Sequence, residues 1–262
     1  MGYDRSMIKR RPLVVGNWKM ELSYRGEVEA VSSLVKQLKN ENQEAEIVVC
    51  PSFVSLAGIS DIVAKSEKVA LGAQDVFWEE KGAYTGEVSV LQLRELVSWC
   101  IVGHSERRAL ALETDEQAVR KVAVLLKHGM SPIICVGETA QEREAGQTVA
   151  KLTQQIKVLL SEMPLSALSK IVVAYEPIWA IGTGVTPELS DISEAMLMIR
   201  KLALERYGRE GAEKMRVIYG GSVNAKNVRE IVSEPGVDGV LVGGASVRSM
   251  EFARIIREVI SK

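Results

Sequence analysis

Residues 171–184 read Ile171-Val172-Val173-Ala174-Tyr175-Glu176-Pro177-Ile178-Trp179-Ala180-Ile181-Gly182-Thr183-Gly184. The run begins as an apolar, β-branched segment and then delivers one carboxylate, Glu176. The segment after it is fixed at one end by a proline and loosened at the other by two glycines. We interpret the run as a buried strand that carries a catalytic base, followed by a lid loop, Pro177 to Gly184.

Segments like the one before Glu176 recur along the whole chain. They are Leu13-Gly16, Glu46-Cys50, Val69-Ala73, Cys100-Gly103, Pro132-Val136, Ile171-Tyr175, Arg216-Tyr219 and Gly239-Val242. Most are nearly continuous in apolar residues instead of alternating with polar ones, which is typical of strands buried on both faces in a parallel sheet.

Helical patterns separate the strand-like segments. They cover Glu27-Lys39, Asp115-Lys127, Val149-Leu160, Ile192-Tyr207, Ala225-Val232 and Ser249-Ile260, with Thr114 and Asp191 as expected N-caps. Eight strand-then-helix units in about 250 residues indicate the α/β class and a closed (β/α)8 barrel. The alternative is an open doubly wound sheet, which carries a glycine-rich turn after its first strand. Here Gly16-Asn17-Trp18-Lys19 follows that strand. We therefore expect a single barrel domain, residues 12–262, after a flexible arm, residues 1–11.

Composition argues against several classes of partner. The 262 residues are 47% hydrophobic and 26% charged, with a net charge of −1, so neither nucleic acid nor a membrane surface is expected as the main partner. The chain lacks an apolar run of about 18 residues, and its first ten residues do not resemble a secretory signal. Cys50, Cys100 and Cys135 lie in apolar segments, which indicates reduced core thiols and a cytoplasmic location. Two distant histidines and no paired cysteines predict no metal site and no cofactor.

Barrel enzymes place their chemistry at the carboxyl ends of the strands. The polar or glycine residues there are Asn17, Lys19, Gln74, Asp75, His104, Ser105, Glu106, Glu138, Glu176, Gly221, Ser222, Gly243 and Gly244.

Three of these residues have side chains suited to proton transfer or to stabilising an anion. A lid would desolvate Glu176 and raise its pKa, whereas the alternative is a solvated loop glutamate. His104 opens a short helical turn whose dipole disfavours the imidazolium, which predicts a neutral hydrogen-bond donor; the alternative is a structural histidine. Lys19 is a fixed positive charge for an oxyanion, or else an ordinary surface lysine.

Two glycine pairs follow the last two strands, in Gly220-Gly221-Ser222 and Gly243-Gly244-Ala245-Ser246. Their backbone N–H groups, with the helix dipoles behind them and with Gly182, are suited to hold a phosphate group. The alternative for each pair is a tight turn.

Five motifs together resemble the triosephosphate isomerases, over essentially the whole chain from Pro12 onward. They are Gly16-Asn17-Trp18-Lys19-Met20, Val102-Gly103-His104-Ser105-Glu106-Arg107-Arg108, Ala174 to Gly184, Tyr219-Gly220-Gly221-Ser222-Val223 and Leu241-Val242-Gly243-Gly244-Ala245-Ser246. The resemblance implies a TIM-barrel isomerase of glycolysis and gluconeogenesis. It would interconvert dihydroxyacetone phosphate and D-glyceraldehyde 3-phosphate through an enediolate.

The resemblance also implies a role for each site residue. Glu176 would move the proton between carbons, His104 would polarise the carbonyl, and Lys19 with Asn17 would stabilise the oxyanion. Glu106 matches a further acidic position. Backbone positions expected to hold phosphate are Gly182, Ser222, Gly243 and Gly244.

The same resemblance implies which residues contact the lid and that a second subunit is present. Trp179 would pair with Glu138 while the lid is open, and Tyr219 and Ser222 would hold it shut. The loop Gly82-Glu87 would insert into a twin subunit, with Thr85 near the partner's active site, which predicts a homodimer.

The sequence departs from the family pattern at two places. Val185 is followed at once by Thr186-Pro187 where the family has a lysine and a longer run, so we expect altered lid kinetics. Asp75 replaces the usual asparagine, which predicts weaker or pH-dependent association. Two other functions stay open at this point. One is a different phosphate-binding barrel, such as a sugar-phosphate isomerase or lyase; the other is a barrel that has lost its chemistry and kept a binding role.

Overall fold

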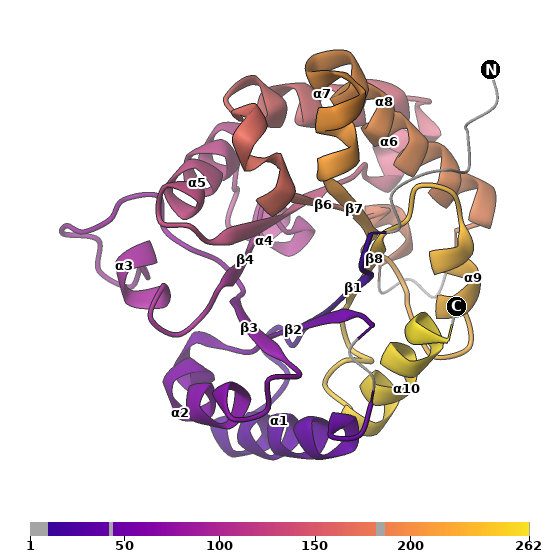
Figure 1. Ribbon diagram of the computed structural model, residues 1–262. Coiled ribbons are helices and arrows are strands. Elements are labelled where there is room, and N and C mark those ends of the chain that lie inside the picture. The colour runs from indigo at the N-terminus through magenta and orange to yellow at the C-terminus, as the bar shows by residue number, and fades with distance from the viewer. Residues whose placement is uncertain (1–9, 42–43, 182–186, 262) are drawn as a thin grey trace.

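Eight parallel strands close into a barrel in the order of the chain (Figure 1). The computed structural model describes residues 10–41, 44–181 and 187–261. The strands are β1 Leu13–Asn17, β2 Glu46–Cys50, β3 Ala70–Ala73, β4 Trp99–Val102, β5 Ser131–Val136, β6 Val172–Tyr175, β7 Arg216–Tyr219 and β8 Gly239–Val242. Leu13 of β1 is in register with Glu46 of β2 on one side and with Gly239 of β8 on the other. This closure confirms the predicted (β/α)8 barrel and excludes the open sheet.

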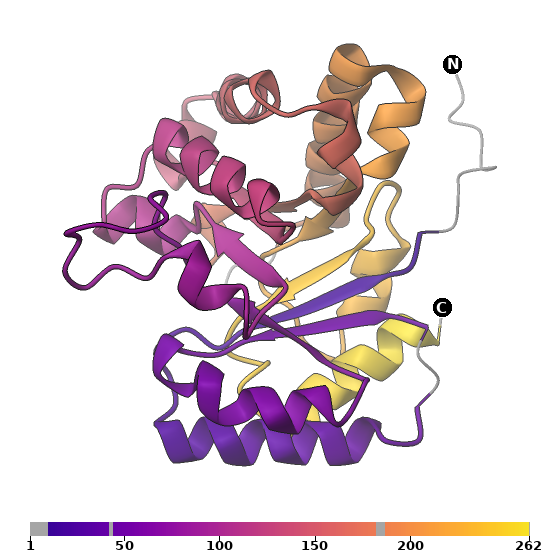
Figure 2. The ribbon, with the colours of Figure 1, turned by 60° about the vertical axis from the view of Figure 1, so that its left-hand side comes forward.

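Helices surround the barrel, as the two ribbon views show (Figures 1 and 2). They are α1 Tyr24–Leu38, α2 Phe53–Ala64, α3 Val90–Leu93, α4 Ser105–Leu110, α5 Asp115–Lys127, α6 Ala140–Glu144, α7 Thr148–Ser161, α8 Leu189–Lys214, α9 Val228–Ser233 and α10 Ser249–Ile260, with 3-10 turns η1 Leu165–Lys170 and η2 Ile178–Ala180. Helices α5 and α10 have their predicted bounds. Helix α2 was not predicted, because its apolar residues are not confined to one face: Val54 is 77% exposed.

One predicted helix cap is confirmed and the other is wrong. The Thr114 side chain accepts a hydrogen bond from Gln117 N at the start of α5. Helix α8 begins at Leu189, two residues before the predicted cap Asp191, because Glu188 is its N-cap and Asp191 accepts from Glu188 N at 3.2 Å. The same helix continues past its predicted end at Tyr207 to Lys214, across a break at Gly208, where φ is 70°.

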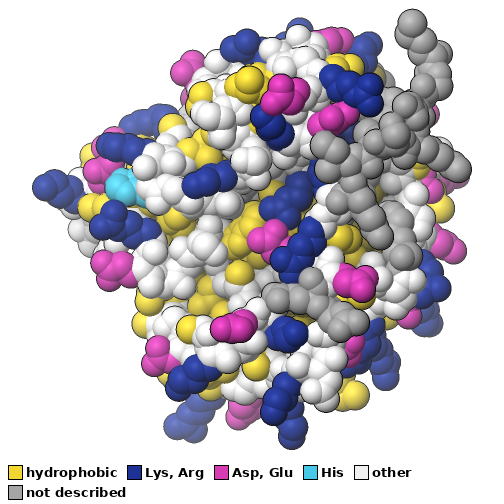
Figure 3. Space-filling model, in the orientation of Figure 1, with side chains coloured by type: hydrophobic (Ala, Val, Ile, Leu, Met, Phe, Trp, Pro, Cys, Tyr) yellow, Lys and Arg dark blue, Asp and Glu magenta, His cyan; other side chains and the backbone are white. Residues whose placement is uncertain are grey.

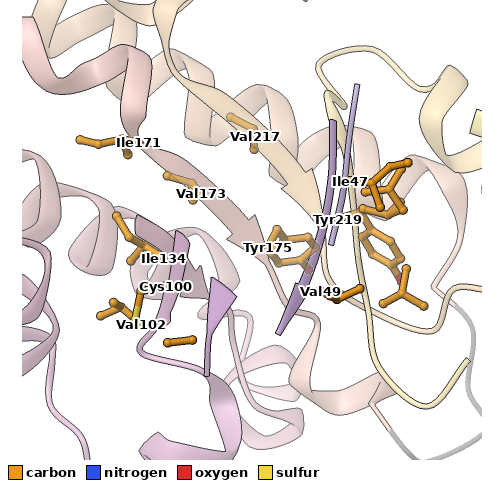
Figure 4. Close-up of a cluster of buried hydrophobic side chains, with 14 of the residues drawn as sticks. Ile47, Val49, Cys100, Val102, Ile134, Ile171, Val173, Tyr175, Val217 and Tyr219 are labelled. Atoms are coloured by element: carbon orange, nitrogen blue, oxygen red, sulfur yellow. The ribbon is translucent and has the colours of Figure 1, made fainter. Parts of the chain in front are cut away.

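The core has an inner and an outer layer that share each strand. Leu13 and Val15 of β1 belong to the cluster inside the barrel, and Val14 between them belongs to the cluster under the helices. Side chains of this outer cluster line the strands in Figure 4. Because both faces are buried, the strands are nearly continuous in apolar residues. The three cysteines are free and buried, and burial raises the pKa of each thiol.

Two arginines at the end of the predicted N-terminal arm contact the barrel. Residues 1–9 of that arm lie outside the described residues. The Arg10 guanidinium donates to the carbonyl of Glu213 at 2.6 Å and pairs with Asp238 at 3.1 Å. Arg11 donates to the carbonyl of Ala45 at 2.8 Å. These two residues therefore pack with the barrel, although the sequence places them in the arm.

On the face shown in Figure 3, basic and acidic side chains lie interspersed among uncharged ones, in keeping with the net charge of −1. Of the helices that the structure describes, none is both long and apolar enough to span a membrane.

Candidate active site

The barrel brings Lys19, His104 and Glu176 to the ends of β1, β4 and β6, where parallel strands deliver all their carboxyl termini to one side. Two direct contacts join the predicted residues in pairs. His104 Nε2 lies 3.0 Å from Glu176 Oε1, and Lys19 Nζ lies 2.5 Å from Glu106 Oε1. Residues separated by about 70 positions in the chain therefore form one polar cluster.

Glu176 is almost fully buried, at 2% exposure. One carboxylate oxygen faces His104, and the other accepts a hydrogen bond from Ser105 N at 3.0 Å. Burial disfavours the charged carboxylate, but His104 and the Ser105 N–H outweigh it, so the pKa of Glu176 lies below its ordinary value. The rise in this pKa that a closed lid would cause stays a prediction, whereas in this structure a histidine and an amide that the sequence did not indicate face the carboxylate.

His104 is the N-cap of α4, and its Nδ1 accepts a hydrogen bond from Glu106 N at 3.2 Å. A ring nitrogen that accepts carries no proton, so this geometry suits a neutral imidazole with its proton on Nε2. Burial also opposes the imidazolium, yet the adjacent Glu176 carboxylate outweighs it and raises the pKa of His104. A second proton on His104 would break the hydrogen bond from the backbone N–H of Glu106 to Nδ1. The helix cap therefore favours a neutral histidine and the Glu176 carboxylate favours a charged one, so the neutral form stays a prediction.

Lys19 adopts a left-handed backbone conformation, with φ at 51°, that non-glycine residues seldom take. Two side chains hold it there. Asn17 Oδ1 accepts from Lys19 N at 3.1 Å, and Gln74 Nε2 donates to the Lys19 carbonyl at 2.8 Å. Gln74 also donates to the carbonyl of Cys50 at 3.0 Å, which ties β1, β2 and β3 together. The sequence placed Gln74 at the barrel mouth but assigned it no role.

The glycines after β8 lie beside Lys19. A Cβ added to Gly243 would come within 3.5 Å of Lys19 Cε and 3.8 Å of its Nζ. A Cβ on Gly244 would meet no atom within 4 Å, so this backbone borders open space. Of the two predicted phosphate positions Gly243 and Gly244, the first therefore adjoins a positive charge. Gly182, Thr183 and Gly184 lie outside the described residues, and their assignment stays a prediction.

The described part of the lid is Pro177 to Ile181, with the turn η2 at its centre. The indole of Trp179 donates to Glu138 Oε1 at 2.8 Å, so the predicted pair is present. Ser222 Oγ donates to the carbonyl of Ala180 at 3.5 Å, which joins the loop after β7 to the lid. Within the described residues, the buried hydroxyl of Tyr219 has no hydrogen-bond partner.

A second charged cluster adjoins the site and was not predicted. Lys121 Nζ contacts Asp75 Oδ1 at 2.7 Å and Glu113 Oε2 at 2.8 Å, and Arg107 Nε contacts the same two side chains at 2.7 and 2.9 Å. Glu113 also accepts from Gly103 N, directly before His104. Burial and Glu113 raise the pKa of Asp75 against the pull of Lys121. Since α4 carries both His104 and Arg107, the cluster braces the helix that holds the histidine.

The segment between β3 and α3 projects from the barrel in both ribbon views (Figures 1 and 2). Every residue from Lys81 to Glu87 is exposed in the single chain, Thr85 among them. Large apolar side chains elsewhere are exposed too: Met20 is 96%, Leu110 84% and Leu112 76% exposed. Contiguous exposed apolar surface is typical of interaction sites, whereas single exposed apolar side chains are common on any protein.

The comparisons with known proteins agree on one family. The family described as triosephosphate isomerase matches residues 12–259. The triosephosphate isomerase of Thermoanaerobacter sp. (strain X514) is 45% identical over 248 residues, 94% of this chain and 99% of that protein. That of Clostridium tetani is 41% identical over 94% of this chain and 96% of its own length. A crystal structure of triosephosphate isomerase from Bartonella henselae superimposes with a TM-score of 0.86 at 32% identity, covering 97% of this chain and all of that one.

Proposed function

Because this chain belongs to the triosephosphate isomerase family, we propose that Glu176, His104 and Lys19 carry out its reaction. The enzyme interconverts dihydroxyacetone phosphate and D-glyceraldehyde 3-phosphate, a step of glycolysis. Family membership also decides between the alternatives: neither a different phosphate-binding barrel nor a barrel without chemistry fits as well. What remains to be assigned is the part that each side chain takes.

The observation that carries the assignment is the 3.0 Å contact between His104 Nε2 and Glu176 Oε1. A base and a hydrogen-bond donor that face each other from β4 and β6 can hold a small substrate between them. Glu176 removes a proton from one carbon, and the electron pair moves onto the carbonyl oxygen to give the enediolate. Glu176 then returns the proton to the neighbouring carbon. His104 carries a proton from the hydroxyl oxygen of the substrate to the former carbonyl oxygen, so that the hydroxyl oxygen becomes the new carbonyl.

His104 and Lys19 stabilise the oxygen on which charge develops. The Nε2–H of a neutral His104 donates to that oxygen, and the ammonium group of Lys19 supplies a fixed positive charge. Substrate must first displace Glu176 from its contacts with His104 and Ser105. Asn17 acts through Lys19, because its Oδ1 accepts a hydrogen bond from the Lys19 backbone N–H. Glu106 orients the ammonium group of Lys19, whose Nζ donates to Glu106 Oε1 at 2.5 Å.

The phosphate group of the substrate is bound by backbone N–H groups of Ser222, Gly243 and Gly244, and by Gly182 of the lid. Support for this comes from the open space at Gly244 and from the proximity of Gly243 to Lys19. Since the phosphate lies away from the reacting carbons, its binding energy is available to close the lid over Glu176. Closure then excludes water from the enediolate.

The enzyme acts as a homodimer in the cytoplasm. The projecting loop Gly82-Glu87, with Thr85 at its tip, enters the partner's site beside Asn17, Lys19 and His104. The exposure of this loop and of Met20, Leu110 and Leu112 supports such an interface. Three free, buried cysteines suit a reducing compartment.

A coupled assay with purified protein tests the function directly. Starting from either triose phosphate, the enzyme brings the two to equilibrium without added metal or cofactor. A protein that binds triose phosphate but leaves it unchanged would overturn the assignment of Glu176, His104 and Lys19 as working catalytic groups.

A further inference from the structure

Arg143, on the short helix α6, contacts Trp179 in the lid and Asp191 in helix α8. Its guanidinium carbon lies 4.1 Å from the centre of the Trp179 ring, near the start of the lid. Its Nη2 donates to Asp191 Oδ1 at 2.8 Å, in the first turn of α8. Neither the reaction nor the phosphate site described above uses this residue.

The same guanidinium also faces Glu138, the partner of Trp179. Glu138 is fully buried, and its Oε1 accepts from the Tyr175 hydroxyl at 3.1 Å and from the Trp179 indole at 2.8 Å. Arg143 Nη1 lies 3.8 Å from that oxygen, and in the described part of the chain it is the only cation within 4 Å of it. The Trp179 ring therefore has a carboxylate at its N–H edge and a cation over its face.

The arrangement suits an arginine more than any other cation. The Arg143 side chain is 36% exposed, so its ion pair with Asp191 is screened by water and adds little stability by itself. What that bond does is orient the flat guanidinium, so that its face rests on the indole. A lysine at this position has no such plane.

We propose that Arg143 is a positioning residue of the isomerase: it holds Trp179 against Glu138 and so keeps the start of the lid in the position that this structure shows. Trp179 is three residues after Glu176, so the same contact retains the base in its resting place beside Ser105 and His104. The inference rests on the proposed function, since it assumes that ligand binding moves Trp179 away from Glu138.

The direction of the expected effect follows from which state Arg143 stabilises. Arg143→Met removes a contact that holds Trp179 against Glu138, so less ligand-binding energy is needed to move Trp179 away. Inorganic phosphate should then inhibit with a dissociation constant about two- to fivefold lower, and KM for triose phosphate should fall by a similar factor, without a rise in kcat. Loss of a residue that merely supports the fold would instead weaken the binding of phosphate and of triose phosphate.

Three comparisons make the test decisive. Arg206→Met on α8 removes another guanidinium, 5.2 Å from the ring of Tyr207, and should leave both constants unchanged. Arg143→Lys keeps the charge and should shift them in the same direction by less, and it carries the test if the methionine variant does not fold. In a Trp179→Leu background, Arg143→Met should have no further effect.

Two kinds of failure can be told apart. If Arg143→Met binds phosphate no more tightly than wild type, or if its effect persists without the Trp179 ring, the inference is wrong while the isomerase activity stands. If the wild-type enzyme neither binds phosphate nor converts triose phosphate, the proposed function itself fails.

Discussion

At the scale of single residues, Glu176 decides whether the site works as proposed. Glu176→Gln keeps the shape of the side chain and the bond from Ser105 N but removes the basic oxygen. Loss of a positioned general base typically lowers the rate about 10²–10⁴-fold. We expect kcat to fall by at least this factor, measured in the coupled assay, while the dissociation constant of inorganic phosphate changes little. Equal losses in turnover and in phosphate binding would make Glu176 a structural residue.

The Glu176–His104 contact also predicts how stability depends on pH. The pKa of Glu176 is lowered in the folded state, so its contribution is present above its unfolded pKa of about 4.3 and is lost as pH falls through the folded value. The pKa of His104 is raised, so its contribution is present below about 6.5 and is lost as pH rises through the folded value. Both shifts describe one interaction, which is therefore strongest between about pH 4.3 and 6.5.

His104→Asn tests that window. The difference in Tm between wild type and the variant should be largest near pH 5.5 and should shrink toward pH 8.5, because an uncharged His104 interacts more weakly with the Glu176 carboxylate. Thermal unfolding followed by circular dichroism over this range gives the measurement. A difference that does not vary with pH would show that His104 stays uncharged beside Glu176, as its cap on α4 favours.

The candidate residues of the site could be predicted from the sequence, whereas most of their contacts could not; the Trp179–Glu138 pair is the exception. Lys19, His104 and Glu176 each lie within two residues of the end of a strand, so the barrel topology alone brings them together. Gln74 reaches the carbonyl of Lys19 across 55 positions, a contact that depends on the register of neighbouring strands. The need for a glycine at position 137 has no local sequence signal either. A Cβ there would lie 1.8 Å from the carbonyl oxygen of Glu176, so only glycine fits.

At the scale of elements, the cap of α5 matters because this helix carries Lys121 into the buried charge cluster. Thr114 and Gln117 satisfy each other's backbone N–H groups, at 3.0 and 3.3 Å. Thr114→Ala should lower the free energy of unfolding by about 1 kcal/mol. That corresponds to a fall in Tm of about 2–4 °C for a domain of this size.

Ser60→Ala is the matched control for the cap. The Ser60 hydroxyl donates to the carbonyl of Ala57 inside α2, where alanine is the better helix former, so this variant should keep its Tm or gain slightly. Similar losses in the two variants would mean that the Thr114 cap adds nothing specific. Threonine is a common N-cap and glutamate is not, so the cap at Thr114 could be predicted whereas the cap at Glu188 could not.

The whole molecule follows from the repetition of one unit, which is why its fold was predictable. Strands buried on both faces are readable as apolar segments, and all eight were found to within two residues at either end. Helix α2 shows the limit, because a helix with apolar residues on several sides has no single face to detect. Asp75 shows another, because it is 5% exposed and paired with Lys121 and Arg107, partners that the sequence does not indicate. Its predicted effect on association stays a prediction.

Assembly is the property of the whole molecule that the proposed function most needs. Thr85→Arg places a charged side chain at the tip of the projecting loop, where the proposed interface with Asn17, Lys19 and His104 of a second subunit leaves no room for it. We expect sedimentation equilibrium to show a shift from dimer to monomer, and specific activity to fall with dilution in parallel. Gln154→Arg on the exposed surface of α7 should change neither. If Thr85→Arg sediments and turns over like wild type at every concentration, the loop does not join subunits, and each barrel works alone.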